Sequence, residues 1–358
     1  MKKYLKIKSI IKFLLIAFMF QCLIVSCQIK YSPIYENFEK NERIYVADGP
    51  EDFVYDKWHT PPRLIISSHE RRKPERFGGI YSLCLETHSV KKLKRSEKNY
   101  IFKAYKPHGI DINHFGEHTY LYVILHDPEN HNKRTENAIA IYEIINDEIH
   151  LIDVLENSEC LWSPNDLSVL PDGQIYVTND YRSSLDLLFK RRISEIAHYQ
   201  PVTKKWKIVA KNICFANGIL AQSNYVFVSA TLDNELLRYK KKSDGSLFEK
   251  KSIAKLKGLD NIMPYNGQLL ISAHLSNWSF LRHYKNKNAL SPMAVYLVNP
   301  KLTNNISNTV LLFKDDGSKI SAGSTAFIYN KSLYISQVFD PFILRCYPIE
   351  YFENYNQK

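Results

Sequence analysis

The sequence has few cysteines, and none of them are spaced as zinc ligands usually are. The 358 residues include six cysteines and no CxxC pair, which argues against a zinc site. The cysteines are Cys22, Cys27, Cys84, Cys160, Cys214 and Cys346. The last four permit several disulfide pairings, and the sequence does not choose among them.

The sequence also lacks long amphipathic helices and linkers. Only residues 183–197 look helical, and no Gly-, Pro- or Ser-rich stretch divides the chain. The hydrophobic fraction of 45% and aromatic fraction of 13% suffice for a large core. The 24 tyrosines and 18 phenylalanines favour strands over helices. We therefore expect one domain, mainly of β-structure.

A concentrated band of positive charge is absent as well. The formal net charge is +11, and five of the lysines lie among the first twelve residues. Without these five charges, the rest of the chain has a net charge of about +6. The remaining Lys and Arg are spread out, so we expect solvated loops and no nucleic-acid partner. A mildly basic chain suits an anionic membrane surface.

The N-terminus has an apolar run too short to span a bilayer. Residues 1–26 combine basic positions with an apolar stretch over 13–25, as in a signal peptide. The sequence Ile24-Val25-Ser26-Cys27 resembles a bacterial lipoprotein box. We expect lipidation of Cys27 and a membrane-anchored lipoprotein of a bacterial cell envelope. The alternative is an ordinary cleaved signal peptide and a secreted or periplasmic soluble protein.

Six aliphatic runs repeat along the remaining chain, about 50 residues apart. They are Leu64–Ser67, Leu121–Ile124, Ile175–Thr178, Val226–Ser229, Leu269–Ser272 and Leu333–Ser336. Turn residues precede several runs, and a further strand-like segment often follows. Six strand-rich units predict an all-β fold, a six-bladed β-propeller over residues 45–350, with a tether at 27–44 and a tail at 351–358. Two β domains of three repeats each are the alternative.

Acidic or amide residues stand upstream of most of these runs. If the runs are innermost strands, the loops that enter them meet at one mouth of the propeller. One set of oxygen donors carries a formal charge of −2: Glu51, Asn165, Asn217, Asp260 and Asn261. Carboxylate and amide oxygens suit calcium. Asp52 and Asp166 are each one residue further along and would face a second ion, with the carbonyl of Ile110 completing its site.

With these motifs in place, the chain resembles the paraoxonase family of calcium-dependent lactonases and arylesterases, within the gluconolactonase-like propellers. The resemblance covers most of residues 45–347. The motifs are Gly49-x-Glu51-Asp52, Pro107–Ile110, Asn165-Asp166, Thr178–Asp180, Phe215–Ile219, Asp260–Ile262, His274 and Gly323–Thr325.

The resemblance implies specific roles for these residues. A catalytic calcium would be held by the five-residue set, and a structural calcium by Asp52, Asp166 and the Ile110 carbonyl. A histidine dyad would pair His108 with His126, and His274 would lie near the mouth and contact substrate. The family disulfide to the position of Cys346 lacks its N-terminal partner here, so ring closure is expected to rest on strand pairing.

The implied reaction is hydrolysis of a small-molecule lactone or ester by a monomer. Calcium would stabilise the oxyanion while His108, assisted by His126, activates water. Asp260 acting as a nucleophile is an alternative. Two other functions stay open: a sugar lactonase of the gluconolactonase type, and a non-catalytic binding propeller stabilised by calcium. The substrate-lining loops differ from the family pattern, so the substrate is left open.

Overall fold

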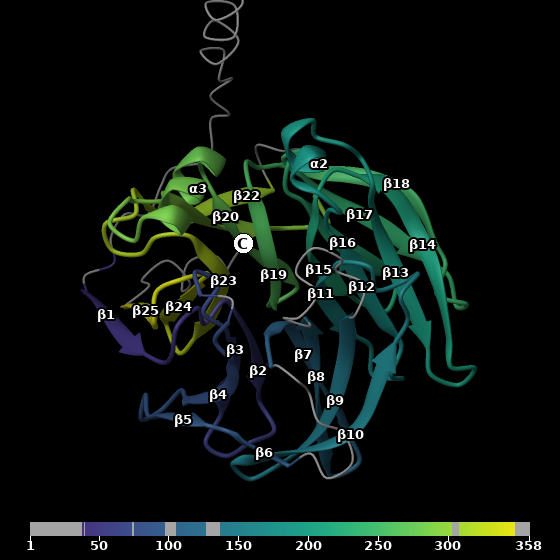
Figure 1. Cartoon of the computed structure of the whole chain (residues 1–358), viewed down its shortest axis with the longest axis horizontal. Coiled ribbons are helices and arrows are strands. Elements are labelled where there is room, and N and C mark those ends of the chain that lie inside the picture. The colour runs from purple at the N-terminus through teal and green to yellow at the C-terminus, as the bar shows by residue number, and fades with distance from the viewer. Residues whose placement is uncertain are drawn as a thin grey trace, which may run out of the picture.

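The chain forms a ring of six antiparallel sheets (Figure 1). The computed structural model describes residues 38 and 40–347, without 74, 97–104, 127–136 and 303–307. The predicted leader with Cys27, most of the predicted tether and the predicted tail lie outside the described residues. The predicted all-β, six-bladed propeller is confirmed.

Five blades have four strands and the second blade has five, and in the first, third, fourth and fifth blades the strands run in sequential order from the inside to the outside of the ring. The first blade contains β2 (Asp52–Asp56), β3 (Arg63–Ser68), β4 (Gly79–Cys84) and β5 (Val90–Lys92). The second contains β7 (Pro107–Phe115), β8 (His118–His126), β9 (Asn137–Ile145) and β10 (Glu148–Glu156), with β6 (Lys94–Ser96) added in parallel to β10. The third contains β11 (Pro164–Val169), β12 (Ile175–Asn179), β13 (Ser194–Gln200) and β14 (Lys205–Ile213).

The other three blades follow the same plan. The fourth contains β15 (Ala216–Ala221), β16 (Tyr225–Ala230), β17 (Glu235–Lys241) and β18 (Leu247–Lys255). The fifth contains β19 (Leu259–Tyr265), β20 (Gln268–His274), β21 (Met293–Val298) and β22 (Thr309–Asp315). The sixth contains β23 (Gly323–Tyr329), β24 (Ser332–Gln337) and β25 (Phe342–Tyr347), with β1 (Lys40–Tyr45) outermost.

The repeated aliphatic runs are the second strands of the blades, and our prediction that they are innermost was wrong. They lie in β3, β8, β12, β16, β20 and β24. The innermost strands are β2, β7, β11, β15, β19 and β23, and most neighbours among them pack directly against one another. A second strand is covered on both faces and therefore reads as a continuous apolar run. An innermost strand carries polar residues and did not produce that signal.

The ring is closed by pairing of the two ends of the described chain. Strand β1 pairs antiparallel with β25, from Lys40 opposite Tyr347 to Tyr45 opposite Phe342. Arg345 Nη1 also donates to Glu42 Oε1 at 2.9 Å. The propeller therefore begins at residue 40 and not at 45. Cys346 is a buried free thiol, so closure rests on strand pairing, as expected.

The predicted helix over 183–197 is mostly wrong. Only α2 (Ser184–Leu188) is helical, and Ser194–Gln200 is the third strand of its blade, β13, because its buried positions pair on both sides. A second helix, α3 (Asn277–Lys285), was not predicted. Among the described residues, no helix is both long enough and apolar enough to cross a bilayer.

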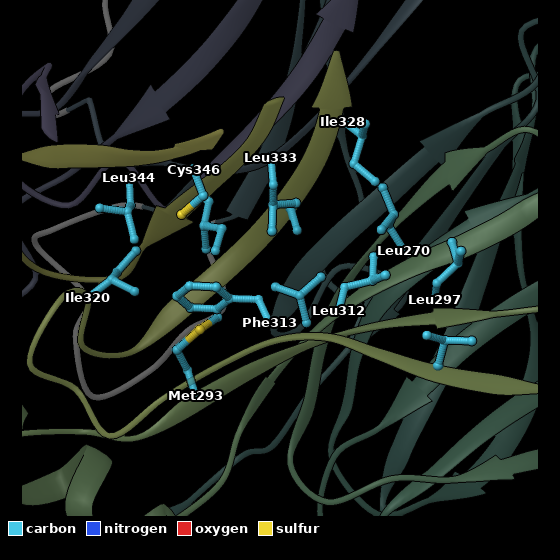
Figure 2. Close-up of a cluster of buried hydrophobic side chains, with 14 of the residues drawn as sticks. Leu270, Met293, Leu297, Leu312, Phe313, Ile320, Ile328, Leu333, Leu344 and Cys346 are labelled. Carbon is cyan, nitrogen blue, oxygen red and sulfur yellow. The ribbon is translucent and has the colours of Figure 1, made fainter. Parts of the chain in front are cut away.

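The hydrophobic core lies between adjacent blades. Figure 2 shows the cluster between the fifth and sixth blades, where Leu270 and Phe313 meet Leu333, Leu344 and Cys346. Full burial of one such side chain contributes about 1.5–3 kcal/mol. This inter-blade packing fixes the innermost strands and the residues they carry.

Candidate active site

A ring of six equivalent dipeptides lies at the start of the innermost strands. In all but the first blade, the pairing register between the first and second strands shifts beside the dipeptide. A β-bulge of this kind turns side chains out of the regular alternation. The dipeptides are Glu51-Asp52, His108-Gly109, Asn165-Asp166, Asn217-Gly218, Asp260-Asn261 and Ser324-Thr325. The structure thus brings the predicted residues together, on the innermost strands themselves except for Glu51, which directly precedes β2.

Two glycines in this ring are required by the close approach of neighbouring strands. A Cβ on Gly218 would lie 2.4 Å from the carbonyl oxygen of Asp260, and one on Gly109 would lie 2.7 Å from that of Asn165. These distances leave no room for a side chain. In two blades the second residue of the dipeptide therefore has no side chain, and the backbones of neighbouring innermost strands pack directly against each other.

A second ring lies at the ends of the second strands. In every blade, a backbone N–H there donates to a carbonyl two residues before the dipeptide, at 2.8–3.2 Å. The donor residues are His69, His126, Asp180, Thr231, His274 and Val338. His126 and His274 were predicted, whereas His69 and Asp180, whose Oδ2 accepts from Asn165 Nδ2 at 3.3 Å, were missed as site residues. Each is the fifth residue after the start of its aliphatic run, a fixed offset that could have identified them.

His108 and His126 form a hydrogen-bonded pair. His108 Nδ1 lies 2.9 Å from His126 Nε2, and His126 Nδ1 lies 2.7 Å from Asn137 Oδ1. The Asn137 amide nitrogen donates to the Leu161 carbonyl at 3.0 Å, which leaves its oxygen to accept from His126. His126 Nε2 is then an acceptor for the Nδ1–H of His108. Asn137 was not predicted, because nothing near it in sequence distinguishes it.

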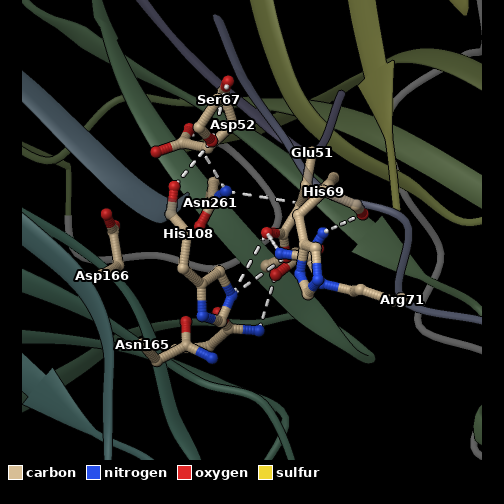
Figure 3. A network of polar contacts seen from close by, with 12 residues as sticks. Glu51, Asp52, Ser67, His69, Arg71, His108, Asn165, Asp166 and Asn261 are labelled. Atoms are coloured by element: carbon tan, nitrogen blue, oxygen red, sulfur yellow. Dashed lines mark hydrogen bonds and ion pairs between the residues drawn. The ribbon is translucent and has the colours of Figure 1, made fainter. Parts of the chain in front are cut away.

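Glu51 faces the other nitrogen of His108. His108 Nε2 lies 3.1 Å from Glu51 Oε2, and Arg71 is ion-paired with the same carboxylate (Figure 3). Burial opposes ionisation of Glu51, but the charges of Arg71 and His108 outweigh it and lower its pKa to about 2. Burial, together with Arg71 and Lys106, lowers the pKa of nearby His69 to about 3, so His69 is neutral.

Asp260 is, with Glu51, one of the two carboxylates among the five predicted calcium donors. Its Oδ1 accepts a hydrogen bond from Asn217 Nδ2 at 2.6 Å, and its Oδ2 lies 2.9 Å from His274 Nε2. The His274 ring packs on Phe280 of α3, with centroids 4.6 Å apart. His274 therefore lies beside Asp260, and its contact with substrate, which the resemblance implied, stays a prediction.

Asp52 and Asp166 lie on the channel side of the ring. They line a cavity of about 240 Å³ together with Ile110 and Asp111. Asp52 Oδ2 accepts from the Ile110 N–H, and Asp166 Oδ2 from the Ile219 N–H, at 2.9 and 2.8 Å. Burial raises the pKa of Asp52 to about 8. Burial and the charge of Asp52 raise the pKa of Asp166.

The donor chemistry of both sets fits calcium. Within the described residues, no three His, Cys, Asp or Glu side chains form a metal cluster by themselves. Three of the five donors in the first set are amides. Calcium accepts such mixed carboxylate and amide oxygens. In the second set, two buried acids oppose each other's ionisation, and a divalent cation between them would offset that repulsion.

Fold and site together define a six-bladed propeller whose channel mouth carries carboxylate, amide and imidazole groups. The chain belongs to the arylesterase family, whose sequence model matches residues 70–346. Glu51 and Asp52 lie before that matched segment. The predicted membership in the paraoxonase and arylesterase group is thereby confirmed.

Two relatives agree with this assignment. The chain is 27% identical over 251 residues to serum paraoxonase/lactonase 3 of Homo sapiens, covering 66% of this chain and 67% of the relative. It is 24% identical over 261 residues to the protein of that name from Mus musculus, with the same coverage.

Two solved structures share the fold. A luciferin-regenerating enzyme gives a TM-score of 0.56 at 13% identity, with 86% of this chain and 94% of that one covered. A gluconolactonase from Xanthomonas campestris gives a TM-score of 0.51 at 15% identity, with 85% and 88% covered. These neighbours support the fold, and the family supports a hydrolase of the lactonase and esterase class.

Proposed function

We propose that the protein is a calcium-dependent hydrolase that opens lactones or hydrolyses aryl esters. The observation that carries the proposal is the orientation of the His108 ring, which has one nitrogen toward His126 and the other toward Glu51. The second ring nitrogen of His108, Nε2, lies 3.1 Å from Glu51 Oε2, in the ring whose oxygens suit a cation. The names of the paraoxonase/lactonase relatives and of the family support the same substrate class.

Two cation sites are assigned to the two sets of donors. The first would use Glu51, Asn165, Asn217, Asp260 and Asn261. The second would use Asp52, Asp166 and the carbonyl of Ile110. A calcium ion in the first site would supply Lewis-acid stabilisation of the oxyanion that forms at the substrate carbonyl.

The chain's own residues handle the proton. His108 Nε2 takes a proton from the attacking water, while its Nδ1–H stays hydrogen-bonded to His126 Nε2. The Asn137 oxygen holds the Nδ1–H of His126 and so keeps the acceptor nitrogen of His126 turned toward His108. The pair thereby shares the positive charge that develops on His108. His274, beside Asp260, is assigned to substrate contact at the mouth.

A substrate panel tests the proposal and separates it from its alternatives. Aliphatic lactones, sugar lactones and aryl esters are assayed with calcium and with excess chelator. Turnover of aliphatic lactones or aryl esters that requires calcium is the expected result. Turnover confined to sugar lactones identifies a gluconolactonase-type enzyme. Calcium binding without turnover of any compound identifies a binding propeller.

A further inference from the structure

Arg71 introduces a positive charge into the ring. Its Nη2 is ion-paired with Glu51 Oε2, and its Nη1 donates to the His69 carbonyl at 3.4 Å. Figure 3 shows the Arg71 side chain reaching the Glu51 carboxylate from the segment after β3. The Arg71 side chain is 19% exposed, so the guanidinium lies at the mouth, within reach of solvent.

The neighbouring Arg72 is held quite differently. Its Nη1 donates to Asp340 at 3.0 Å, its Nη2 donates to the His283 carbonyl at 3.1 Å, and its guanidinium lies 4.6 Å from the Phe339 ring centroid. These contacts join Arg72 to α3 and to the sixth blade. Arg72 thus fixes the segment, whereas the carboxylate that Arg71 contacts is the one assigned to the first cation site.

We propose that Arg71 is an intrinsic cation that competes with calcium for Glu51 and lowers the affinity of the first cation site. The inference rests on the cation sites of the proposed function. Glu51 and Asp260 give the donor set a formal charge of −2, and the Arg71 guanidinium reduces the local sum to −1. Calcium affinity follows the number of charged ligands, so this reduction weakens binding.

The competition is also direct. The guanidinium occupies Glu51 Oε2, the oxygen that His108 Nε2 approaches. A cation that takes this oxygen must move the guanidinium away or share the carboxylate with it. The backbone can stay in place during this exchange, because His69 N–H is bonded to the Gly49 carbonyl at 3.0 Å and Arg72 is clamped on the other side.

The test is a calcium titration of the full chain by isothermal calorimetry, with three variants. Arg71→Gln removes the charge, Arg71→Lys keeps it, and Arg76→Gln removes a charge from the same segment. Arg76 is a matched control, because its side chain is 55% exposed and pairs with Asp48 at 3.6 Å. We expect Arg71→Gln to lower the calcium Kd by about tenfold or more, as one nearby unit charge should. The two other variants should stay near the wild-type value.

The outcomes separate this inference from the proposed function. Calcium binding by the wild type with an unchanged or weaker affinity in Arg71→Gln overturns the inference alone. Absence of binding in both proteins overturns the inference together with the cation sites. Binding by Arg71→Gln but not by the wild type supports the inference in its strongest form. The calcium-induced rise in Tm, measured on the same samples, must follow the same order.

Discussion

His108 Nδ1 and His126 Nε2 lie 2.9 Å apart although His108 is the second residue of strand β7 and His126 is the last residue of strand β8. The two strands form an antiparallel hairpin that turns at Gly116 and Glu117, with Pro107 opposite Leu125. The hairpin brings the first residues of one strand beside the last residues of the next. The same relation in every blade joins the two rings of the site.

The histidine pair yields the first prediction. His108→Gln should lower lactone turnover by about two to four orders of magnitude, the usual contribution of a general base. Calcium affinity should change little, because imidazole is not among the assigned donors. His118→Gln, an exposed change on the same hairpin, is the control. Wild-type turnover in His108→Gln would refute the dyad mechanism and leave the cation sites standing.

Asp260 yields the second prediction. Asp260→Ala removes a buried carboxylate of the first cation site and should abolish turnover and weaken calcium binding. In the wild type, calcium at 100 times its Kd should stabilise the fold by about 2.7 kcal/mol, and chelator should remove this gain. Tm measured with calcium and with chelator checks both statements. Asp244→Ala, on an exposed turn, is the control. An unchanged wild-type Tm in excess chelator would rule out a stabilising ion.

The six-fold pattern of the site could be predicted from sequence because its elements repeat. The aliphatic runs recur about every 50 residues, and polar dipeptides precede most of them, so Glu51, Asn165 and Asp260 could be grouped from the sequence. Periodicity did not reveal which strand of the blade is innermost. A bulged strand with polar residues at its start has no clear alternation, and the signal came from the buried second strand instead.

Other features depend on contacts that no local pattern encodes. Asn137 joins His126 only because β8 and β9 are paired, with His126 opposite Asn137. Arg71, in the segment after β3, meets Glu51, which directly precedes β2, because β2 and β3 are paired antiparallel. The predicted helix over 183–197 failed because β13 has a run of four buried residues near its end and too little alternation to identify a strand.

His198 yields a pH-dependent prediction at a place remote from the site. His198 Nε2 lies 2.8 Å from Gln174 Oε1, and the ring packs against Tyr176. Burial, with Lys207 and Lys241 nearby, lowers its pKa to about 4 from 6.5. Between these values the unfolded chain binds more protons than the folded chain, so stability falls as pH decreases from 6.5 to 4.

The variant His198→Gln isolates this effect. It should flatten the decline in Tm over that pH range, while Tm at pH 8 shows the cost of lost packing separately. His150→Gln, at a histidine that pairs with Glu148 near the surface, is the control. An equally steep decline in His198→Gln would assign the pH dependence to other groups.

The N-terminus yields a prediction that concerns localisation. The sequence Ile24-Val25-Ser26-Cys27 leads us to propose cleavage before Cys27, lipidation of that residue, and attachment to the cell envelope. Each methylene of an attached chain that enters the bilayer adds about 0.8 kcal/mol to membrane binding. Mass spectrometry of the native N-terminal peptide should find a lipid-modified Cys27. An unmodified peptide that begins elsewhere would instead favour a secreted or periplasmic protein.

Strand β1 yields the last prediction, because it alone pairs the start of the described chain with its end. Ile44 is 8% exposed and packs with Phe53, Leu64 and Ile343 between the first and last blades. Ile44→Ala should therefore lower the free energy of unfolding by about 2–4 kcal/mol, the usual cost of truncating a buried aliphatic side chain. Lys40→Ala, at an exposed position of the same strand, should stay within about 0.5 kcal/mol of the wild type. Denaturant unfolding measures both values. With no disulfide at Cys346 to hold the ring, a negligible effect of Ile44→Ala would mean that pairing of β1 with β25 contributes little to closure, and that packing between the innermost strands maintains the ring.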